Sequence, residues 1–288
     1  MSLLKGIARS IGRCRNAALA VAAALGVVLS ASAGIAAEPH PWQLGFQPPA
    51  TISMERLNSL HDELLVITIL ITLFVLGLLL YVILRFNEKR NPVPSRTSHN
   101  TVIEVLWTVI PVLILVIIAI PSFKLLYFLD RTQKAEMTVK VTGHQWYWTY
   151  DYPDNGGLSF DSNMIPVDDL QPGQKRLLDV DNRMVVPVGT NVRVLVTGTD
   201  VMHSFFVPSF GVQTYAVIGR LNETWFNAER EGVYYGQCNQ ICGINHPFMP
   251  IAIEVVSKDK FNQWLADAKK KFASAGAAAT QVAAARTE

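Results

Sequence analysis

Two long apolar runs occupy the first half of the chain, and an alternating pattern follows them. Residues 64–84 and 106–126 are almost entirely apolar, and each run is about as long as the hydrocarbon core of a bilayer requires. Residues 85–96, between the runs, carry four bases and one acid. Because basic loops stay in the cytoplasm, we predict a transmembrane hairpin over residues 61–130, with a cytoplasmic loop at 85–100 and both ends facing outward.

The first 37 residues are typical of a secretory signal peptide. Four bases within the first 15 residues precede an Ala- and Val-rich stretch that ends at Ala37. The alternative is a retained first membrane helix, although an Ala-rich core inserts weakly. Removal of residues 1–37 would leave residues 38–60 as an outward-facing amino-terminal segment ahead of the hairpin.

After the second apolar run the pattern changes to that of strands. β-Branched residues alternate with polar ones, and turn signals rich in Gly, Asn and Pro separate the runs. The clearest strands are expected over residues 137–142, 191–196 and 248–256. We therefore predict an all-β sandwich domain over residues 131–257. Residues 258–288 are expected to form a short amphipathic helix, over 262–272, and a frayed Ala-rich tail.

A short segment near the end of this domain gathers side chains that bind soft metals. Cys238, Cys242, His246 and Met249 lie within twelve residues. Two thiols, an imidazole and a thioether as a long axial ligand are the donors of copper electron-transfer sites. A structural zinc site would favour a tighter Cys-x2-Cys spacing and no Met. The simpler alternatives are a disulfide, or two buried thiols beside a Met of the core.

These residues belong to longer motifs that resemble subunit II of cytochrome c oxidase. The run Tyr234-Tyr-Gly-Gln-Cys238-Asn-Gln-Ile-Cys242-Gly-Ile-Asn-His246-Pro-Phe-Met249-Pro is similar to the copper A motif of that family. Other motifs in the family order are Val201-Met-His203-Ser, Gly143-His-Gln-Trp-Tyr-Trp148 and Gly219-Arg-Leu-Asn222. The resemblance covers nearly the whole chain after residue 38 and implies the copper A subunit of a bacterial aa3-type haem-copper oxidase. The implied fold is a two-helix transmembrane hairpin followed by an all-β, cupredoxin-like sandwich.

The resemblance also implies a ligand set for two copper ions bridged by both thiolates. The implied ligands are His203, Cys238, the backbone carbonyl of Gln240, Cys242, His246 and Met249. A copper protein with a single ion needs only one Cys, so the second Cys is the discriminating residue. An outward compartment tends to oxidise such a pair of thiols to a disulfide, so the thiols are expected to be bound to metal.

Further roles follow only from the resemblance. Trp148 is expected to lie exposed above the copper and to receive the electron, and Glu104 to mark the entrance of a proton channel into subunit I. The acids that match docking positions for cytochrome c are Asp151 and Asp200, and Asp179 and Asp181 are further candidates. Without the resemblance, the Trp indicates core packing, the Glu marks the membrane boundary, and each acid is simply solvated.

The implied partners are oxidase subunits I and III, cytochrome c and membrane lipid, with no nucleic acid. The resemblance places haem in subunit I, and the lack of a haem-attachment motif in this sequence excludes a fused cytochrome c. The implied activity is electron transfer from cytochrome c toward the reduction of oxygen to water, coupled to proton pumping. The implied location is the bacterial inner membrane, with the amino terminus and the copper domain in the periplasm.

Several positions depart from the family pattern. Gln240 replaces the usual Glu that binds a magnesium ion shared with subunit I, and an amide is a weaker ligand for a hard cation than a carboxylate. Gln213 and Tyr215 stand where the family commonly has Lys and Asp, and Ile218 where it has Pro. Weaker magnesium binding and an altered surface toward subunit I are therefore expected, with the reaction unchanged.

The charge balance favours a cationic partner. The chain carries +2 overall, but it carries −8 once the basic segments 1–37, 85–96 and 258–288 are set aside. A basic soluble cytochrome would be steered to such a surface, although ordinary solubility charge is the simpler explanation. A quinol oxidase subunit would lack the copper ligands, and a copper-delivery protein would not need the Trp-Tyr-Trp motif. Six His residues cannot supply the His-rich catalytic domain of a nitrous oxide reductase.

Overall fold

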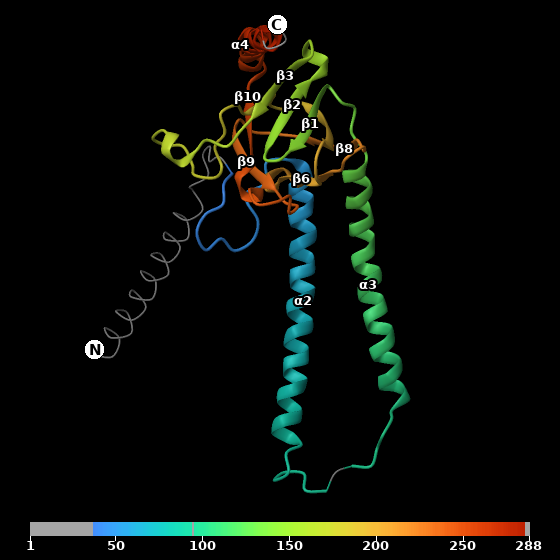
Figure 1. Cartoon of the computed structure of the whole chain (residues 1–288). Coiled ribbons are helices and arrows are strands. Elements are labelled where there is room, and N and C mark those ends of the chain that lie inside the picture. The colour runs from blue at the N-terminus through green and yellow to red at the C-terminus, as the bar shows by residue number, and fades with distance from the viewer. Residues whose placement is uncertain (1–36, 94, 286–288) are drawn as a thin grey trace, which may run out of the picture. The chain divides into compact units, whose positions relative to one another are not determined.

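The computed structural model describes residues 37–93 and 95–285, so the predicted signal peptide, except for Ala37, lies outside the described residues. The helices of the described chain are α2 (Ile52–Arg85), α3 (Thr101–Asp130) and α4 (Lys258–Ala285) (Figure 1). Both α2 and α3 are long and apolar enough to cross a membrane, and their apolar side chains are exposed rather than buried in protein. The predicted two-helix hairpin is confirmed.

The part of the chain between α3 and α4 forms two five-stranded sheets. The strands are β1 (Met137–His144), β2 (Tyr147–Tyr152), β3 (Leu158–Ser162), β4 (Met184–Pro187), β5 (Asn191–Gly198), β6 (His203–Val207), β7 (Val212–Ala216), β8 (Asn222–Asn227), β9 (Gly232–Cys238) and β10 (Pro250–Val256). One sheet has the order β3-β2-β1-β5-β8 and the other β4-β10-β9-β6-β7. The pairs β1–β5 and β4–β10 are parallel. The predicted all-β sandwich is confirmed.

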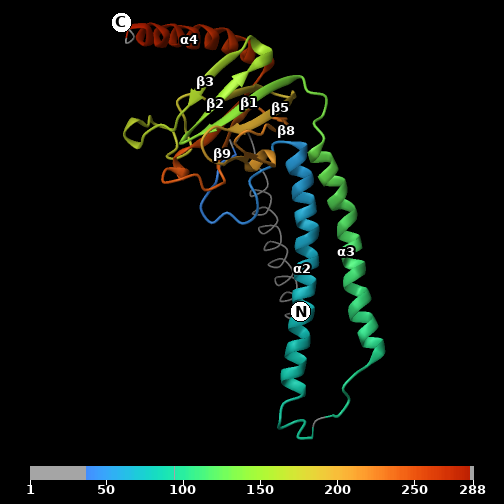
Figure 2. The same ribbon diagram turned by 45° about the vertical axis from the view of Figure 1, so that its right-hand side comes forward.

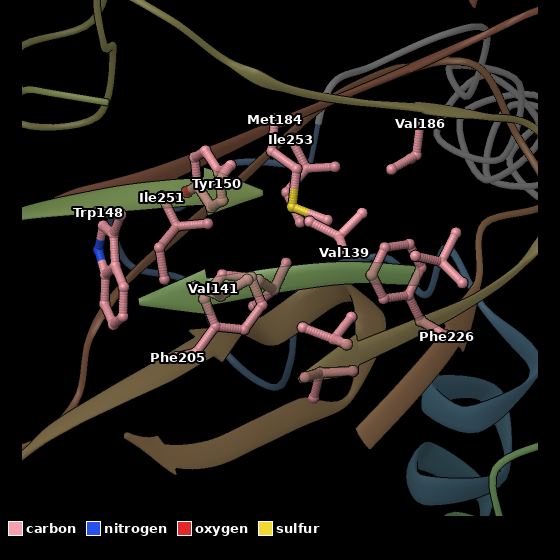
Figure 3. Packing of buried hydrophobic residues seen from close by; sticks show 14 of the residues in the cluster. Val139, Val141, Trp148, Tyr150, Met184, Val186, Phe205, Phe226, Ile251 and Ile253 are labelled. Atoms are coloured by element: carbon pink, nitrogen blue, oxygen red, sulfur yellow. The ribbon is translucent and has the colours of Figure 1, made fainter. Parts of the chain in front are cut away.

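The core lies between the two sheets and is filled by alternate side chains of the strands. In β2, Trp148, Tyr150 and Tyr152 point inward and are each 0 % exposed, whereas the residues between them are partly exposed. Figure 3 shows side chains of both sheets, among them Val141 and Ile251, packed together. Because successive side chains of a strand point to opposite faces, this period of two buries one face of each sheet.

Hydrogen bonds tie the outer ends of both long helices to the sandwich. Thr51, which caps α2, accepts from the backbone N–H of Met54 at 3.1 Å and donates to the carbonyl of Phe210 at 2.8 Å. The indole Nε1 of Trp225 in β8 donates to the carbonyl of Leu129 near the end of α3 at 3.2 Å. Each membrane helix is therefore joined to the sandwich by a bond that also satisfies a polar group at a helix end.

The carboxy-terminal helix α4 is longer than the helix predicted over residues 262–272. It continues to Ala285. The prediction of a frayed tail from residue 273 is therefore wrong for residues 273–285. Ala has the highest helix propensity, so the Ala-rich stretch continues the helix. Trp264 packs against Tyr152 and Phe160 of the first sheet, and Figure 2 shows α4 beside β3.

Tyr152 provides a test of how the two sheets are joined. Its hydroxyl donates to the carbonyl of Val185 in β4 at 3.0 Å and accepts from the N–H of the same residue at 2.9 Å. The substitution Tyr152→Phe leaves both buried backbone groups without this partner, so we expect the free energy of unfolding to fall by about 1–3 kcal/mol. Chemical denaturation of the purified chain, followed by tryptophan fluorescence, measures the change.

Tyr147→Phe is the matched control. Its hydroxyl is in the same strand, lies on the partly exposed face and has no hydrogen bond within the described chain. The control should change the free energy of unfolding by no more than roughly 0.5 kcal/mol. Equal effects of the two substitutions would show that the Tyr152 hydroxyl does not join the sheets.

Candidate metal centre

The side chains predicted as metal ligands come from two strands and one loop. His203 opens β6, Cys238 ends β9, and the loop between β9 and β10 contains Cys242, His246 and Met249. Strand β6 is paired with β9, so the start of β6 lies beside the end of β9. Because β9 and β10 are antiparallel neighbours, the loop that joins them stays at this same end of the sheet.

The sulfur and nitrogen atoms of these side chains converge. The two Sγ atoms of Cys238 and Cys242 are 3.9 Å apart, and Nδ1 of His203 lies 3.9 Å from Cys238 Sγ. Nδ1 of His246 lies 3.4 Å from Cys242 Sγ, and Sδ of Met249 lies 3.5 Å from it. The structure thus brings together all the predicted side-chain ligands, and it buries all of them except His246, which is partly exposed.

This arrangement fits soft metal ions. A thiolate–metal bond is roughly 2.3 Å long, as in zinc sites, so two sulfurs 3.9 Å apart can bind the same ion. The backbone carbonyl oxygen of Gln240 lies 3.3 Å from Cys238 Sγ, on the same thiol. Both thiols are free, so the alternative of a disulfide is wrong. Within the described residues, His203, Cys238 and Cys242 form the one group of three His, Cys, Asp or Glu donors within 4.8 Å.

The protein sets the protonation of the donors before any metal arrives. Nε2 of His203 is 2.9 Å from Asp200 Oδ1, and donation of its proton there leaves the Nδ1 lone pair free for a metal. Burial alone would raise the pKa of the Cys238 thiol, but hydrogen bonds from His203 and the Ser204 backbone outweigh it and lower that pKa. Burial, and then the neighbouring Cys238, raise the pKa of Cys242. Cys238 is therefore the more acidic thiol of the pair, and metal binding must release the proton of Cys242.

A glycine of the first sheet makes room for the His203 imidazole. A Cβ atom added to Gly143, near the end of β1, would lie 2.9 Å from Cδ2 and 3.0 Å from Cγ of His203. A contact that short would force the ring to move. Gly143 therefore sets the position of the imidazole.

Three side chains from the β1–β2 region bind the backbone of the loop between β9 and β10, residues 239–249, which we call the ligand loop. Nε2 of Gln145 and Nε1 of Trp146 both donate to the carbonyl of Cys242, at 2.8 and 3.2 Å. Nε1 of Trp148 donates to the carbonyl of Met249 at 3.1 Å. The β1–β2 region of the first sheet thus binds the backbone of Cys242 and Met249 in the loop of the second sheet. These bonds limit how far the ligand atoms can move when metal binds.

Comparison with known proteins agrees with this geometry. Residues 137–256 match the periplasmic domain of cytochrome c oxidase subunit II, and residues 39–125 match its transmembrane domain. The chain is 56 % identical over 252 residues to a probable cytochrome c oxidase subunit 2 of Rickettsia bellii, which covers 88 % of this chain and 93 % of the relative. The chain belongs to the cytochrome c oxidase subunit II family. It is a subunit of an oxidoreductase and a membrane protein with a periplasmic domain.

Other relatives of the subunit II family extend beyond bacteria. Cytochrome c oxidase subunit 2 of Oenothera berteroana is 54 % identical over 234 residues, which is 79 % of this chain and 91 % of the relative. Among solved structures, the periplasmic domain of subunit II of cytochrome oxidase from Bradyrhizobium japonicum is 56 % identical. It covers 49 % of this chain and 99 % of that domain, with a TM-score of 0.47.

The prediction that Trp148 lies exposed is wrong. Trp148 is 0 % exposed, and its ring lies edge-on to His203 with the centroids 6.0 Å apart. Trp146, two residues earlier, is partly exposed and contacts the Cys242 backbone. Sequence reasoning missed Trp146, although the alternation of Trp148, Tyr150 and Tyr152 with polar residues indicates that these three point inward.

The predicted docking acids of this subunit II chain differ in their surroundings. Asp151 is partly exposed and forms an ion pair with Lys140 at 3.4 Å. Asp200 is exposed, but its two oxygens bind His203 and the backbone N–H groups of Gln145 and Val201.

The two further acids also have hydrogen-bond partners, but only Asp179 is buried. Asp179 is 1 % exposed, and its carboxylate binds Arg183 at 2.9 Å and the Tyr235 hydroxyl at 3.1 Å. Asp181 accepts from the backbone and side chain of Asn163. A docking role for Asp179 is therefore wrong, because a cationic partner cannot reach its carboxylate.

Glu104 has a structural partner at the start of α3. Its Oε1 accepts from the backbone N–H of Asn100 at 3.3 Å, while the Asn100 side chain caps the helix by accepting from the N–H groups of Val102 and Ile103. This reciprocal arrangement resembles a capping box, with the acid one position later than in the usual motif. The residue therefore stabilises the helix start, and a proton-channel role stays a prediction.

The contact between Gly143 and His203 can be tested by adding one methyl group. We expect Gly143→Ala to displace the imidazole and to lower the affinity for copper by roughly 10–100-fold, the usual effect of disturbing a ligand's support. Isothermal titration of the metal-free chain with copper measures this loss. Gly77→Ala is the control, because its Cβ would meet no atom within 4 Å. Unchanged affinity in Gly143→Ala would mean that this contact does not position His203.

Proposed function

We propose that this chain is the electron-accepting subunit of a proton-pumping terminal oxidase. It takes electrons from cytochrome c at a binuclear copper A centre and delivers them to haem in subunit I, where oxygen is reduced to water. The observation that carries the proposal is the convergence of two free thiols, two imidazoles and a thioether in one site. Membership of the family supports the same function.

The donor set supports two copper ions rather than one. Each thiol has its own neighbouring imidazole, His203 for Cys238 and His246 for Cys242. The Gln240 carbonyl lies beside the first thiol and the Met249 thioether beside the second. When bound, a pair of copper ions would supply reversible acceptance of one electron. The chain keeps that exchange fast by holding the donors in a buried, hydrogen-bonded loop that has little freedom to rearrange.

Trp146 is the residue that we assign as the first acceptor of the electron, in place of Trp148. It is partly exposed, and its indole nitrogen contacts the carbonyl of the ligand Cys242. Ile241 and Ile244 in the same loop are 82 % and 86 % exposed. An aromatic ring beside exposed apolar side chains is typical of a protein docking surface, and here it would receive the haem edge of cytochrome c.

The remaining predicted partners and sites belong to the same proposal. Subunits I and III would pack against the apolar faces of α2 and α3, and Glu104 would lie at the entrance of a proton channel into subunit I. The positions that depart from the family pattern are on the surface, with Tyr215 and Ile218 45 % and 53 % exposed and Gln240 partly exposed. An apolar surface there and an amide at residue 240 favour weak magnesium binding at the contact with subunit I.

Electron paramagnetic resonance of the copper-loaded chain tests the dicopper site. We expect a hyperfine pattern from one electron shared by two copper nuclei, and a copper content of two ions per chain. His203→Asn should remove the shared pattern because one ion loses its imidazole. His40→Asn, which changes an exposed His outside the site, should keep it. A pattern from a single nucleus in the unaltered chain would contradict the proposal.

The assignment of Trp146 has its own test. Trp146→Phe should slow electron uptake from reduced cytochrome c on the order of tenfold, the loss typical of an aromatic anchor removed from a docking surface. Stopped-flow mixing of the copper-loaded chain with reduced cytochrome c measures the rate. Trp264→Phe, on α4, should leave it unchanged. A normal rate in Trp146→Phe, with a normal copper spectrum, would exclude Trp146 as the acceptor.

A further inference from the structure

A pocket of about 250 Å³ lies between the two membrane helices. Arg56, Ser59 and Glu63 line it from α2, and Pro121 and Lys124 line it from α3, with Leu side chains between them. The small side chains of Ser59 and Pro121 leave this gap between the helices. Its volume equals that of about eight waters, which is enough for a phosphate and the atoms attached to it.

The pocket lies at one boundary of the membrane. Glu63 directly precedes the apolar run of α2, and Lys124 lies within the last turn of the apolar run of α3. The basic loop at residues 85–96 is at the opposite ends of both helices, so the pocket faces the outer leaflet. At this depth the hydrocarbon of a bilayer gives way to phosphate groups.

The side chains that line the pocket leave one positive charge uncompensated. The Arg56 guanidinium carbon lies 3.8 Å from the centre of the Phe128 ring, a cation–π contact that uses none of the N–H groups as a hydrogen-bond donor to a carboxylate. Within the described chain, none of Arg56, Glu63 and Lys124 forms an ion pair, and Arg56 and Lys124 are exposed. The three side chains sum to +1, so a group of charge −1 would neutralise them.

We propose that this pocket binds the headgroup of a phospholipid with a net charge of −1. Its phosphate would lie between Arg56 and Lys124, and its acyl chains would follow the apolar sides of α2 and α3 into the membrane. Cations at a membrane boundary commonly pair with lipid phosphate, and a long Lys side chain can reach that level from within the span. A carboxylate of another subunit would also match the charge, but the position of the pocket at the level of the lipid phosphates favours the lipid.

The test uses the full chain, purified in detergent and stripped of lipid. It is mixed with equal amounts of phosphatidylglycerol and phosphatidylcholine, and native mass spectrometry counts the lipids that stay bound. We expect one phosphatidylglycerol to be retained in preference to phosphatidylcholine. Arg56→Gln and Lys124→Gln should each lower its retention roughly fivefold, the effect of losing one basic side chain near a lipid surface.

Lys89→Gln is the matched control, because it removes a cation near the opposite membrane boundary without touching the pocket. Its lipid retention should equal that of the unaltered chain, and far-UV circular dichroism should show that all variants fold. Equal retention of the two lipids by the unaltered chain would overturn the proposal, as would unchanged retention in Arg56→Gln and Lys124→Gln. If Arg56→Gln and Lys124→Gln lose co-purifying oxidase subunits but keep their lipid, a carboxylate of another subunit occupies the pocket, and the proposal is overturned. None of these readouts depends on copper.

Discussion

The approach of the His203 imidazole to the bare backbone of Gly143 is the contact on which the metal centre depends. His203 belongs to one sheet and Gly143 to the other, so the distance between the sheets sets the position of the ring. A sandwich packed around Trp148 and Tyr150 cannot change that distance without opening gaps in its core. The core of the sandwich is therefore part of the metal centre, because it determines where one ligand can be.

Contacts between the two sheets also fix the position of the ligand loop. Its backbone carbonyls at Cys242 and Met249 accept hydrogen bonds from indole and amide groups of the opposite sheet. These carbonyls belong to ligand residues, so fixing them fixes the sulfur atoms as well. A donor set that is in place before metal binds has little to reorganise when its charge changes, and small reorganisation is what rapid electron exchange requires.

The sequence predicted the features that depend on local spacing. Uninterrupted apolar runs predicted α2 and α3, and the short interval from Cys238 to Met249 predicted most of the ligands because one loop carries them. The position of His203 beside Cys238 depends on the pairing of β6 with β9, 35 residues apart, which spacing does not reveal. It came from the family resemblance. The predicted exposure of Trp148 rested on the family resemblance and is wrong, because β2 buries every second side chain and Trp148 is one of these.

Net charge was a weaker guide than geometry to how a redox partner docks. The acidic balance counts Asp179, although its charge is buried against Arg183, and Asp200, although both its oxygens are already bound. Long-range attraction sums over all charges and can still steer a basic protein toward this face. Close contact is different, because a compensated carboxylate gains little from another cation. In the docking that we propose, orientation at the metal centre comes from the exposed apolar side chains of the ligand loop. Charge sets the rate of encounter, and apolar contact sets the geometry.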